Sequence, residues 1–269
     1  MLMEKVAEIL CEASAEVVEP RFRALTAGEV MEKAPGDLVT VADREAEAII
    51  TRRLRELLPV PVVGEEAVAA DPALARALHN EPACWLVDPV DGTANFVAGR
   101  PDFAVMASLV RDGEAVAAWI WQPMTRTAYA AELGAGAWRN DIRLTRAPAA
   151  WRPGSWRGAM KKRLLDRDLL PGLRERASAF GLLTEGRRSA GMEYPLVAGD
   201  ELDFLLYWRT LPWDHAPGSL LVREAGGVSA RLDGSPYRAD PPGGEDGLLV
   251  ACDPQTWEGV RAVLLGLPG

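Results

Sequence analysis

The first hydrophobic pattern along the chain has the period of an α-helix. In residues 3–23 the apolar side chains recur every three or four positions, and this spacing places them on one face of a helix. Pro20 predicts a break near the end of that helix. A second pattern of the same period covers about 41–58, and Thr40 or Asp37 is a candidate cap for its start.

The middle of the chain changes to the pattern of β-strands. A short apolar run at 60–63 ends in the residues GEE, and further runs follow at 103–110, 115–121 and 127–133. The residues RDGE at 111–114 favour a hairpin, and GAGAWRND favours another. We therefore predict a meander, so that at least part of the sheet is antiparallel.

The second half mixes helical and strand patterns. Residues 147–157 are rich in proline and glycine, which predicts a boundary or crossover between sub-lobes of about 1–146 and about 147–269 within one domain, 1–269. Helices and strands alternate irregularly, so we predict an α/β protein of stacked helix and sheet layers with mixed sheets. The expected elements are helices near 166–180, 214–225 and 254–265, a segment around 188–199, and strands at 203–207, 226–232 and 247–251.

The composition is that of an ordinary globular protein. The chain has 269 residues, of which 48% are hydrophobic and 26% charged, so it is long enough for a sizeable core. The formal net charge of −9 argues against binding of a nucleic acid polymer, which needs a basic face. A small phosphorylated ligand is still compatible with that charge, because a bound metal reverses the local sign.

Neither a membrane segment nor a cysteine framework is expected. No run of about 18 apolar residues occurs, and the first ten residues do not resemble a signal peptide. Cys11, Cys84 and Cys252 are odd in number and far apart, which supports neither disulfides nor a zinc site. We therefore expect reduced thiols in a cytoplasmic protein that has no membrane contact.

Two carboxylates at the end of an apolar run give the clearest chemical signal. In CWLVDPVDGT, Asp88 and Asp91 stand three residues apart, Pro89 restricts the backbone and Gly92 permits a tight turn. Two acids beside a buried strand end repel each other, and a divalent cation would remove both the repulsion and the cost of burial. The backbone N–H groups and the Thr93 hydroxyl would bind an anion. From these ten residues alone, a capped turn with two solvated acids is the alternative.

Distant parts of the chain supply further carboxylates. Glu65 and Glu66 follow a short strand, and Asp214 stands at the start of a predicted helix, where its alternative role is that of an N-cap. Such acids are the pieces of an all-oxygen metal site, which Mg²⁺ and Mn²⁺ prefer. His215 is expected to pack near the site rather than to bind the metal.

Four sequence blocks resemble the successive signatures of the inositol monophosphatase family: GDLVTVAD, GEE, WLVDPVDGTANF and PWDHAPGSLLVREAGG. The resemblance covers about residues 33 to 232 in the family's order and spacing. It implies a layered αβαβα sandwich of the inositol monophosphatase and fructose-1,6-bisphosphatase type. It also implies a magnesium-dependent, lithium-sensitive phosphatase of small molecules, commonly a homodimer.

The same resemblance implies the metal ligands. Glu65, Asp88 and the backbone carbonyl of Val90 would hold a first Mg²⁺ ion. Asp88, Asp91 and Asp214 would hold a second ion, and Glu65 would also hold a third, looser one. Mn²⁺ is the expected substitute for Mg²⁺.

The resemblance further implies the catalytic residues, which are Asp43, Thr93 and Glu65. Gly92 and Thr93 would contact the substrate phosphate, and Asp43 and Thr93 would orient the attacking water. Without the resemblance, Asp43 would be interpreted as a solvated acid in the first turn of a helix. Lys33 stands near the loop that reaches the third ion in relatives, or else is a surface lysine.

Substrate specificity is where this chain departs from the family. Inositol-specific members typically place a glutamate seven residues before the last metal-binding Asp, and here Tyr207 stands at that position. Packing in the core or an interface is the alternative for Tyr207 and Trp208. The candidates for substrate specificity are Asp91, Glu193, Tyr207 and Arg209. Three arginines either meet a second anionic group of the substrate or are solvated: Arg187, Arg188 and Arg209.

We therefore expect a metal-activated water to hydrolyse the phosphate monoester of a small metabolite. Inositol 1-phosphate or a related sugar or polyol phosphate is the first choice. Histidinol phosphate, a 3′(2′),5′-bisphosphate nucleotide and fructose 1,6-bisphosphate are the alternatives. A non-catalytic metal- or ligand-binding relative is the alternative of another class, and the presence of the whole set of acids and Thr93 argues against it.

Overall fold

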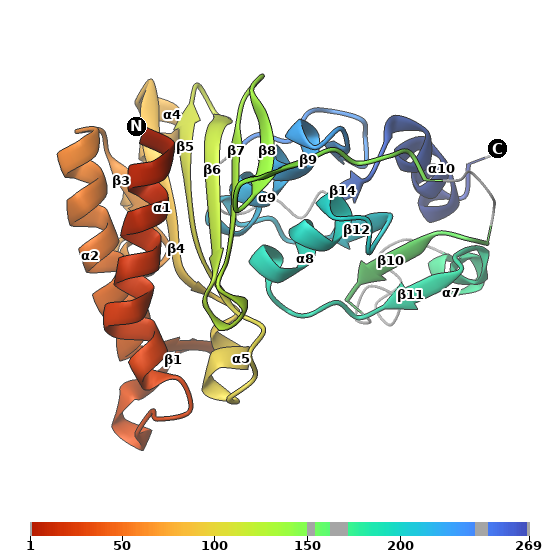
Figure 1. The fold of residues 1–269 in the computed structure, drawn as a ribbon. Helices are drawn as coiled ribbons and strands as arrows, with labels where there is room; N and C mark the ends of the chain where they lie inside the picture. Colours follow the sequence, from red (N-terminus) through yellow and green to blue (C-terminus); the bar gives the residue numbers. More distant parts are fainter. Residues whose placement is uncertain (1, 150–153, 162–171, 240–246, 268–269) are drawn as a thin grey trace.

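Five stacked layers make up the fold, in the order helices, sheet, helices, sheet, helices (Figure 1). The computed structural model describes residues 2–149, 154–161, 172–239 and 247–267, and the structural statements below refer to these residues. The layer order confirms the predicted αβαβα architecture. It also leaves two helices between two sheets, with sheet on both sides of them.

The N-terminal helices cover the outer face of the larger sheet (Figure 1). α1 (Leu2–Ala13) buries the periodic apolar side chains, and a π-helical stretch and a 3₁₀ turn that contains Pro20 follow it, as the predicted break requires. α2 (Val41–Leu57) begins after Thr40, which forms a capping box with Asp43. Thr40, rather than Asp37, is therefore the cap.

The larger sheet has seven strands in chain order. The first two pair in parallel and the rest form an antiparallel meander, which confirms the predicted hairpins. Its strands are β3 (Val62–Gly64), β4 (Ala83–Asp91), β5 (Ala104–Arg111), β6 (Glu114–Gln122), β7 (Thr127–Glu132), β8 (Gly136–Arg139) and β9 (Ile142–Leu144). In this half of the chain, the elements that were not predicted include the hairpin of β1 (Val30–Ala34) and β2 (Asp37–Thr40), and the short helices α3 (Glu65–Ala70), α4 (Ala77–Asn80) and α5 (Thr93–Val97).

The smaller sheet is mixed and has the strand order β11-β10-β12-β14-β13. Its strands are β10 (Arg157–Met160), β11 (Leu182–Thr184), β12 (Phe204–Tyr207), β13 (Val228–Arg231) and β14 (Leu248–Ala251). α7 (Leu173–Arg176) and α10 (Pro254–Leu265) form the last layer, while α8 (Ala190–Ala198) and α9 (Pro212–Glu224) lie between the sheets. The predicted boundary at 147–157 and the predicted helix near 166–180 fall partly outside the described residues. The division into sub-lobes at about residue 147 stays a prediction.

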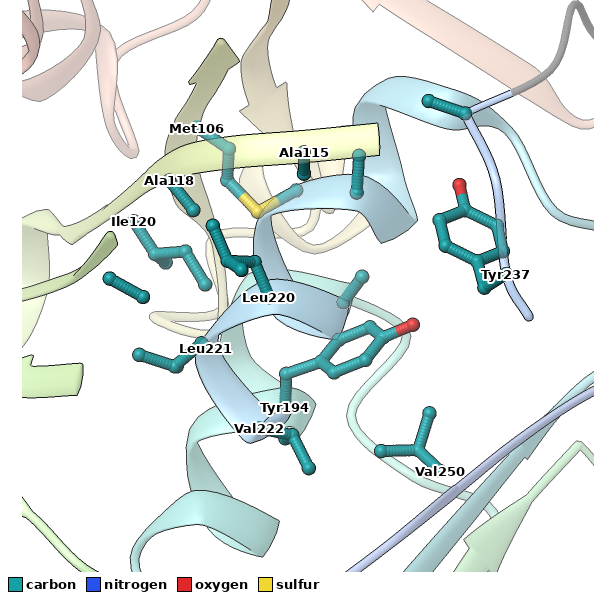
Figure 2. Close-up of a cluster of buried hydrophobic side chains, with 14 of the residues drawn as sticks. Met106, Ala115, Ala118, Ile120, Tyr194, Leu220, Leu221, Val222, Tyr237 and Val250 are labelled. Atoms are coloured by element: carbon teal, nitrogen blue, oxygen red, sulfur yellow. The ribbon is translucent and has the colours of Figure 1, made fainter. Parts of the chain in front are cut away.

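α9 is the centre of the shared core (Figure 2). It is buried nearly all round, as expected of a helix with sheets on both sides. Leu220 packs in one cluster with Met106 of the larger sheet and Val250 of the smaller sheet. Both sheets therefore depend on this helix for burial of their inner faces, and removal of one such leucine side chain costs about 2–5 kcal/mol.

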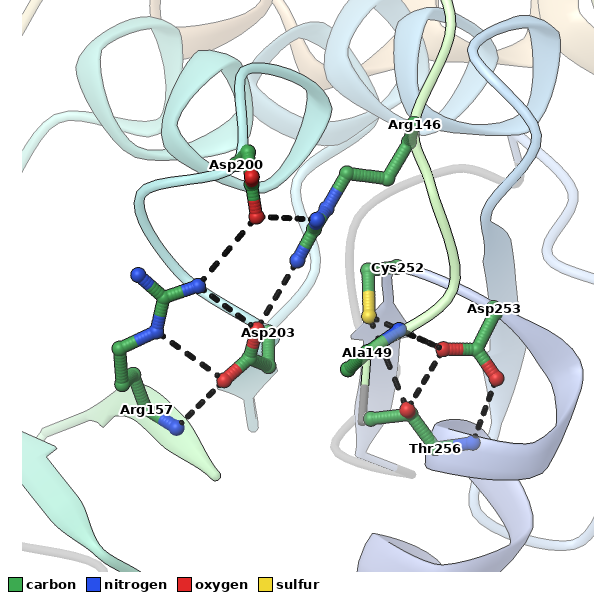
Figure 3. Close-up of polar contacts among 8 residues, drawn as sticks. All are labelled: Arg146, Ala149, Arg157, Asp200, Asp203, Cys252, Asp253 and Thr256. Atoms are coloured by element: carbon green, nitrogen blue, oxygen red, sulfur yellow. Dashed lines mark hydrogen bonds and ion pairs between the residues drawn. The ribbon is translucent and has the colours of Figure 1, made fainter. Parts of the chain in front are cut away.

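A buried ion network joins the chain after β9 to the smaller sheet (Figure 3). Asp203 accepts hydrogen bonds from Arg146 Nη2 at 2.9 Å and from the backbone N–H of Arg157 at 2.8 Å. Both arginines also pair with Asp200, whose side chain is 69% exposed against 6% for Asp203. The buried acid therefore carries the charge that the network must neutralise.

No helix in the described part of the chain has the length and apolarity needed to cross a membrane. All three cysteines have free thiols, and those of Cys84 and Cys252 are buried.

We expect Asp203→Asn to lower the free energy of unfolding by about 3 kcal/mol, because the change removes one partner of a buried ion pair. Asp200→Asn is the matched control, and its loss should stay below about 1 kcal/mol because that carboxylate is exposed. Urea unfolding of both variants measures the difference. Equal losses would contradict the assignment of the network to Asp203.

Candidate active site

The end of β4 brings two carboxylates to one cavity. The pairing of β4 with β5 shifts register between Asp88 and Asp91, so the chain does not alternate faces there as a regular strand does. Gly92 then turns the chain into α5 with a φ of +92°, a left-handed conformation that favours glycine. A Cβ atom at this position would also lie 3.0 Å from the Asp102 carbonyl oxygen. The predicted tight turn is thus confirmed.

The cavity has a volume of about 210 Å³. It is lined by residues that are far apart in the sequence, from β4, the start of α3 and the start of α9. All of the predicted metal and phosphate residues are among them: Glu65, Asp88, Val90, Asp91, Gly92, Thr93 and Asp214. The cavity wall also includes Lys161, Arg188 and Arg209.

Asp91 ties this cavity to the second half of the chain. Its carboxylate accepts hydrogen bonds from Ser189 Oγ at 2.5 Å, from the Gly191 N–H at 2.6 Å and from the Ala190 N–H at 3.1 Å. These donors precede or begin α8. The position of α8 therefore depends on the same acid that lines the cavity.

Asp43 and Thr93 form a second link, between α2 and α5. Asp43 is fully buried and accepts hydrogen bonds from the Thr40 N–H at 2.8 Å and from Thr93 Oγ1 at 3.0 Å. Thr93 Oγ1 also lies 2.9 Å from the Val90 carbonyl oxygen. The alternative of a solvated acid is therefore wrong, because the capping box holds Asp43 inside the protein.

Lys33 is held at the edge of the cavity by two acids. Its Nζ lies 2.7 Å from Glu65 Oε1 and 2.8 Å from Glu66 Oε1. Burial alone would lower the pKa of Lys33, but the two carboxylates raise it above its usual value. The alternative of a surface lysine is therefore wrong, and the β1–β2 hairpin that carries it contacts the site.

Glu47 supports this part of the site from α2, and the sequence analysis missed it. Its carboxylate accepts hydrogen bonds from the backbone N–H groups of Glu66 and Ala67, each at 2.8 Å. A Cβ atom on Gly64, the last residue of β3, would lie 2.4 Å from that carboxyl group, so a side chain there would displace the Glu47 carboxylate from these hydrogen bonds. The available signal was a glutamate on the apolar side of the 41–58 helical pattern.

A second cavity of about 170 Å³ adjoins the first, and Asp91, Asp214, Arg188 and Arg209 line both. The remaining candidates for specificity, Glu193 and Tyr207, line this second cavity. The Tyr207 hydroxyl donates to Glu193 Oε2 at 2.7 Å, and the ring stacks on Tyr194. Tyr207 thus both packs, as the alternative predicted, and reaches the cavity.

His215 and Arg187 differ in their positions relative to the two cavities. His215 is buried at the wall of the second cavity, and burial lowers its pKa to about 3, so its ring is neutral near pH 7. Its Nδ1 lies 3.0 Å from the Tyr194 hydroxyl, in agreement with a packed role. The Arg187 guanidinium pairs with Asp102 at 3.3 Å and lines neither cavity.

Lys161 and Ser189 are site residues that the sequence analysis missed. Lys161 follows β10 and lines both cavities, and Ser189 donates to Asp91. No local pattern marks either residue. Their function depends on where the smaller sheet and α8 are placed.

The cavity's carboxylates are difficult to ionise together. Burial raises the pKa of Glu65 to about 8, of Asp214 to about 7 and of Asp91 to about 6, and neighbouring acids add to each shift. Burial and the charges of Glu65, Asp91 and Asp214 also raise the pKa of Asp88 well above its usual value. A divalent cation would relieve this repulsion.

The donor set fits magnesium, because it consists of carboxylate and carbonyl oxygens. Within the described residues, no three acidic, histidine or cysteine side chains converge on a single point as ligands do. The reason is visible in the contacts, since Glu65 is drawn to Lys33 and Asp91 to Ser189 and the start of α8. The donor chemistry is thus present, with its carboxylates distributed around the cavity.

Comparison with known proteins relates this site to one family. The model of the inositol monophosphatase family matches residues 2–263. An inositol-1-monophosphatase of Rhizobium meliloti is 35% identical over 77% of this chain and 76% of its own length. A Nus factor SuhB of Vibrio cholerae is 30% identical over 88% of this chain and 84% of its own. The crystal structure of extragenic suppressor protein suhB from Bartonella henselae superimposes with a TM-score of 0.79 at 26% identity, and the match covers 98% of both chains.

The raised pKa values predict how stability depends on pH. Carboxyl groups with raised folded pKa values stabilise the fold fully below their ordinary pKa values, near 4, and that contribution is lost as the pH rises through about 6 to 8. In a chelator we therefore expect the melting temperature to fall between pH 5.5 and pH 8. Magnesium at one fixed concentration, about 100 times its Kd at pH 8, should add about 2.7 kcal/mol to the free energy of unfolding at pH 8. The same concentration should add less at pH 5.5, where protons compete for the carboxylates. An equal gain at both pH values in thermal melts would contradict a magnesium site at these acids.

Proposed function

Because the chain belongs to the inositol monophosphatase family and is a phosphoric monoester hydrolase, we propose that it hydrolyses the phosphate monoester of a small metabolite with Mg²⁺ as its metal. The observation that carries the proposal is the first cavity described above. It is lined by carboxylates from three elements and by Thr93, whose hydroxyl donates to Asp43. A site with several buried acids and few apolar groups suits a charged substrate together with its counter-ions.

The proposed metal ligands all line that cavity. Glu65, Asp88 and the Val90 carbonyl oxygen would hold one ion, Asp88, Asp91 and Asp214 would hold a second, and Glu65 would also hold a third, as the family resemblance implies. Bound Mg²⁺ supplies neutralisation of the phosphate charge, a lowered pKa for a water molecule and stabilisation of the leaving oxygen. Mn²⁺ fits the same oxygen donors as a substitute.

Thr93 and Asp43 position the attacking water in this proposal. The Thr93 hydroxyl contacts both Asp43 Oδ1 and the Val90 carbonyl oxygen, so its proton is held by acceptors and a lone pair can accept from the water. Burial raises the pKa of Asp43 to about 6, which makes its carboxylate a better proton acceptor near neutral pH. Gly92 and Thr93, at the turn into α5, contact the phosphate.

For the substrate, we propose inositol 1-phosphate or a related sugar or polyol phosphate, as the name of the Rhizobium meliloti relative suggests. Histidinol phosphate, a 3′(2′),5′-bisphosphate nucleotide and fructose 1,6-bisphosphate are the alternatives. Asp91, Glu193, Tyr207 and Arg209 at the second cavity are the proposed determinants of that choice. We further propose that the protein is a cytoplasmic homodimer and that lithium inhibits its activity.

Asp88→Asn tests the metal site with an isosteric change. The amide can still accept from the Val90 N–H and can donate to Asp214, so repulsion falls and the metal-free protein should melt at a higher temperature. Turnover should disappear, and so should the stabilisation by magnesium. Phosphate release from the four candidate substrates, with and without lithium, and thermal melts with magnesium measure these effects.

Asp141→Asn, at an exposed acid far from the cavity, is the control and should behave as wild type. Near-normal turnover by the Asp88 variant at saturating magnesium would show that the site is elsewhere. Failure of the wild type to release phosphate from any of these esters would reject the proposed function.

Thr93→Val separates positioning of the water from binding of the metal. Removal of the hydroxyl should lower kcat by about 10²–10⁴-fold, the range for a positioned proton-transfer group. Stabilisation by magnesium should stay close to wild type, because no carboxylate ligand is removed. Steady-state kinetics and melts at one magnesium concentration measure both effects, and a loss below tenfold in kcat would contradict the role of Thr93.

A further inference from the structure

Among the described residues, the charged side chains that line the second cavity are three acids and three cations. The acids are Glu193, Asp91 and Asp214, and the cations stand before or after buried elements. The cavity shares part of its wall with the catalytic cavity. A substrate whose phosphate lies in the first cavity would therefore place a neighbouring group in the second.

The acceptor side of this cavity is already used by the protein. Glu193 is 6% exposed, and its Oε1 accepts hydrogen bonds from the backbone N–H groups of Arg187 at 2.6 Å and Arg188 at 2.8 Å. Its Oε2 accepts from the Tyr207 hydroxyl at 2.7 Å. Oε1 thus holds the turn before α8 and Oε2 holds Tyr207 of β12, so both carboxylate oxygens and the Tyr207 proton already have a partner within the protein.

The other two acids are committed as well. Both Asp91 oxygens accept hydrogen bonds from Ser189 and the first residues of α8. Asp91 and Asp214 are also ligands in the proposed metal site, where Mg²⁺ would cancel their charge. In the part of the chain that the structure describes, few acceptors are therefore left in this cavity for the hydroxyl groups of a neutral polyol.

The donor side is different, because three cations line the same cavity. Arg188 stands immediately before Ser189, Arg209 stands in the segment between β12 and α9, and Lys161 follows β10. Arg188 and Arg209 are exposed side chains that line both cavities, so they can reach a ligand in either one. Arginine presents several N–H groups in a planar arrangement that matches carboxylate and phosphate.

We propose that the second cavity binds a second anionic group of the substrate, a carboxylate or a further phosphate, and that Arg188 and Arg209 are its specificity-determining residues. The inference rests on the proposed phosphatase function, because it names the class of phosphate ester that this site prefers. It narrows the substrates proposed above: a phosphorylated hydroxy acid or a bisphosphate is preferred, and inositol 1-phosphate, a monophosphate of a neutral polyol, is hydrolysed less efficiently.

Matched substrates test the preference. 2-Phosphoglycerate and glycerol 2-phosphate differ only by a carboxylate in place of a hydroxymethyl group, and fructose 1,6-bisphosphate and fructose 1-phosphate differ by one phosphate. At saturating free magnesium, kcat/KM in at least one pair should be at least about tenfold higher for the member that carries the additional carboxylate or phosphate. This is the difference expected for one hydrogen-bonded charge pair. The pair that shows the preference identifies the group as carboxylate or phosphate.

Variants locate the preference at this cavity. The ratio to measure is kcat/KM for the member with the additional anionic group divided by kcat/KM for its partner. Arg188→Gln and Arg209→Gln should each lower this ratio by about tenfold, whatever they do to the rate on the partner that lacks the group. Arg187→Gln is the matched control, since that neighbouring guanidinium pairs with Asp102 and lines neither cavity. Its ratio should equal that of the wild type.

The outcomes separate the two proposals. Hydrolysis of the two esters that lack the additional anionic group, with no preference for either partner that carries it, overturns this inference and leaves the proposed function intact. A preference that survives both cavity variants, or that falls equally in Arg187→Gln, overturns the assignment to Arg188 and Arg209. No hydrolysis of any ester rejects the proposed function and this inference with it.

Discussion

Repulsion among carboxylates buried around one cavity is the constraint on which the rest of this structure depends. Asp88, Asp91 and Asp214 approach one another because β4 ends where α9 begins, and burial makes each acid costly to ionise. The protein offsets part of this cost with hydrogen bonds from backbone and hydroxyl donors, most clearly at Asp91. The remaining charge is what a divalent cation would neutralise, so stability and metal binding are coupled.

The same contacts that restrain the acids also assemble the fold. Asp91 fixes the start of α8, Asp43 caps α2 while it accepts from Thr93, and Lys33 joins the β1–β2 hairpin to Glu65. Between the sheets, α9 carries Asp214 at its first turn and fills the shared core with its apolar side chains. A change in the packing of α9 would therefore move a proposed metal ligand.

The second cavity shows how a neighbouring site acquires a chemical preference without a change in the catalytic residues. Glu193 is a carboxylate whose two oxygens bond the turn before α8 and the Tyr207 hydroxyl, so it acts as a structural group in spite of its place in the wall. The cations Arg188 and Arg209 stand on segments that connect the central helices to the smaller sheet. Such segments can vary while the core that holds the acids stays unchanged.

The sequence by itself determined the layered α/β fold, the long helices, the meander and the acids at strand and helix ends, because period and turn residues are local signals. The family resemblance, confirmed by the comparisons, identified the cavity's acids as one set. Only the tertiary structure decided that Asp43 is buried, that Glu47 holds the turn at Gly64 and that Lys161 and Ser189 reach the site. These placements depend on contacts between residues far apart in the chain, and no local pattern of apolar and polar positions encodes such contacts.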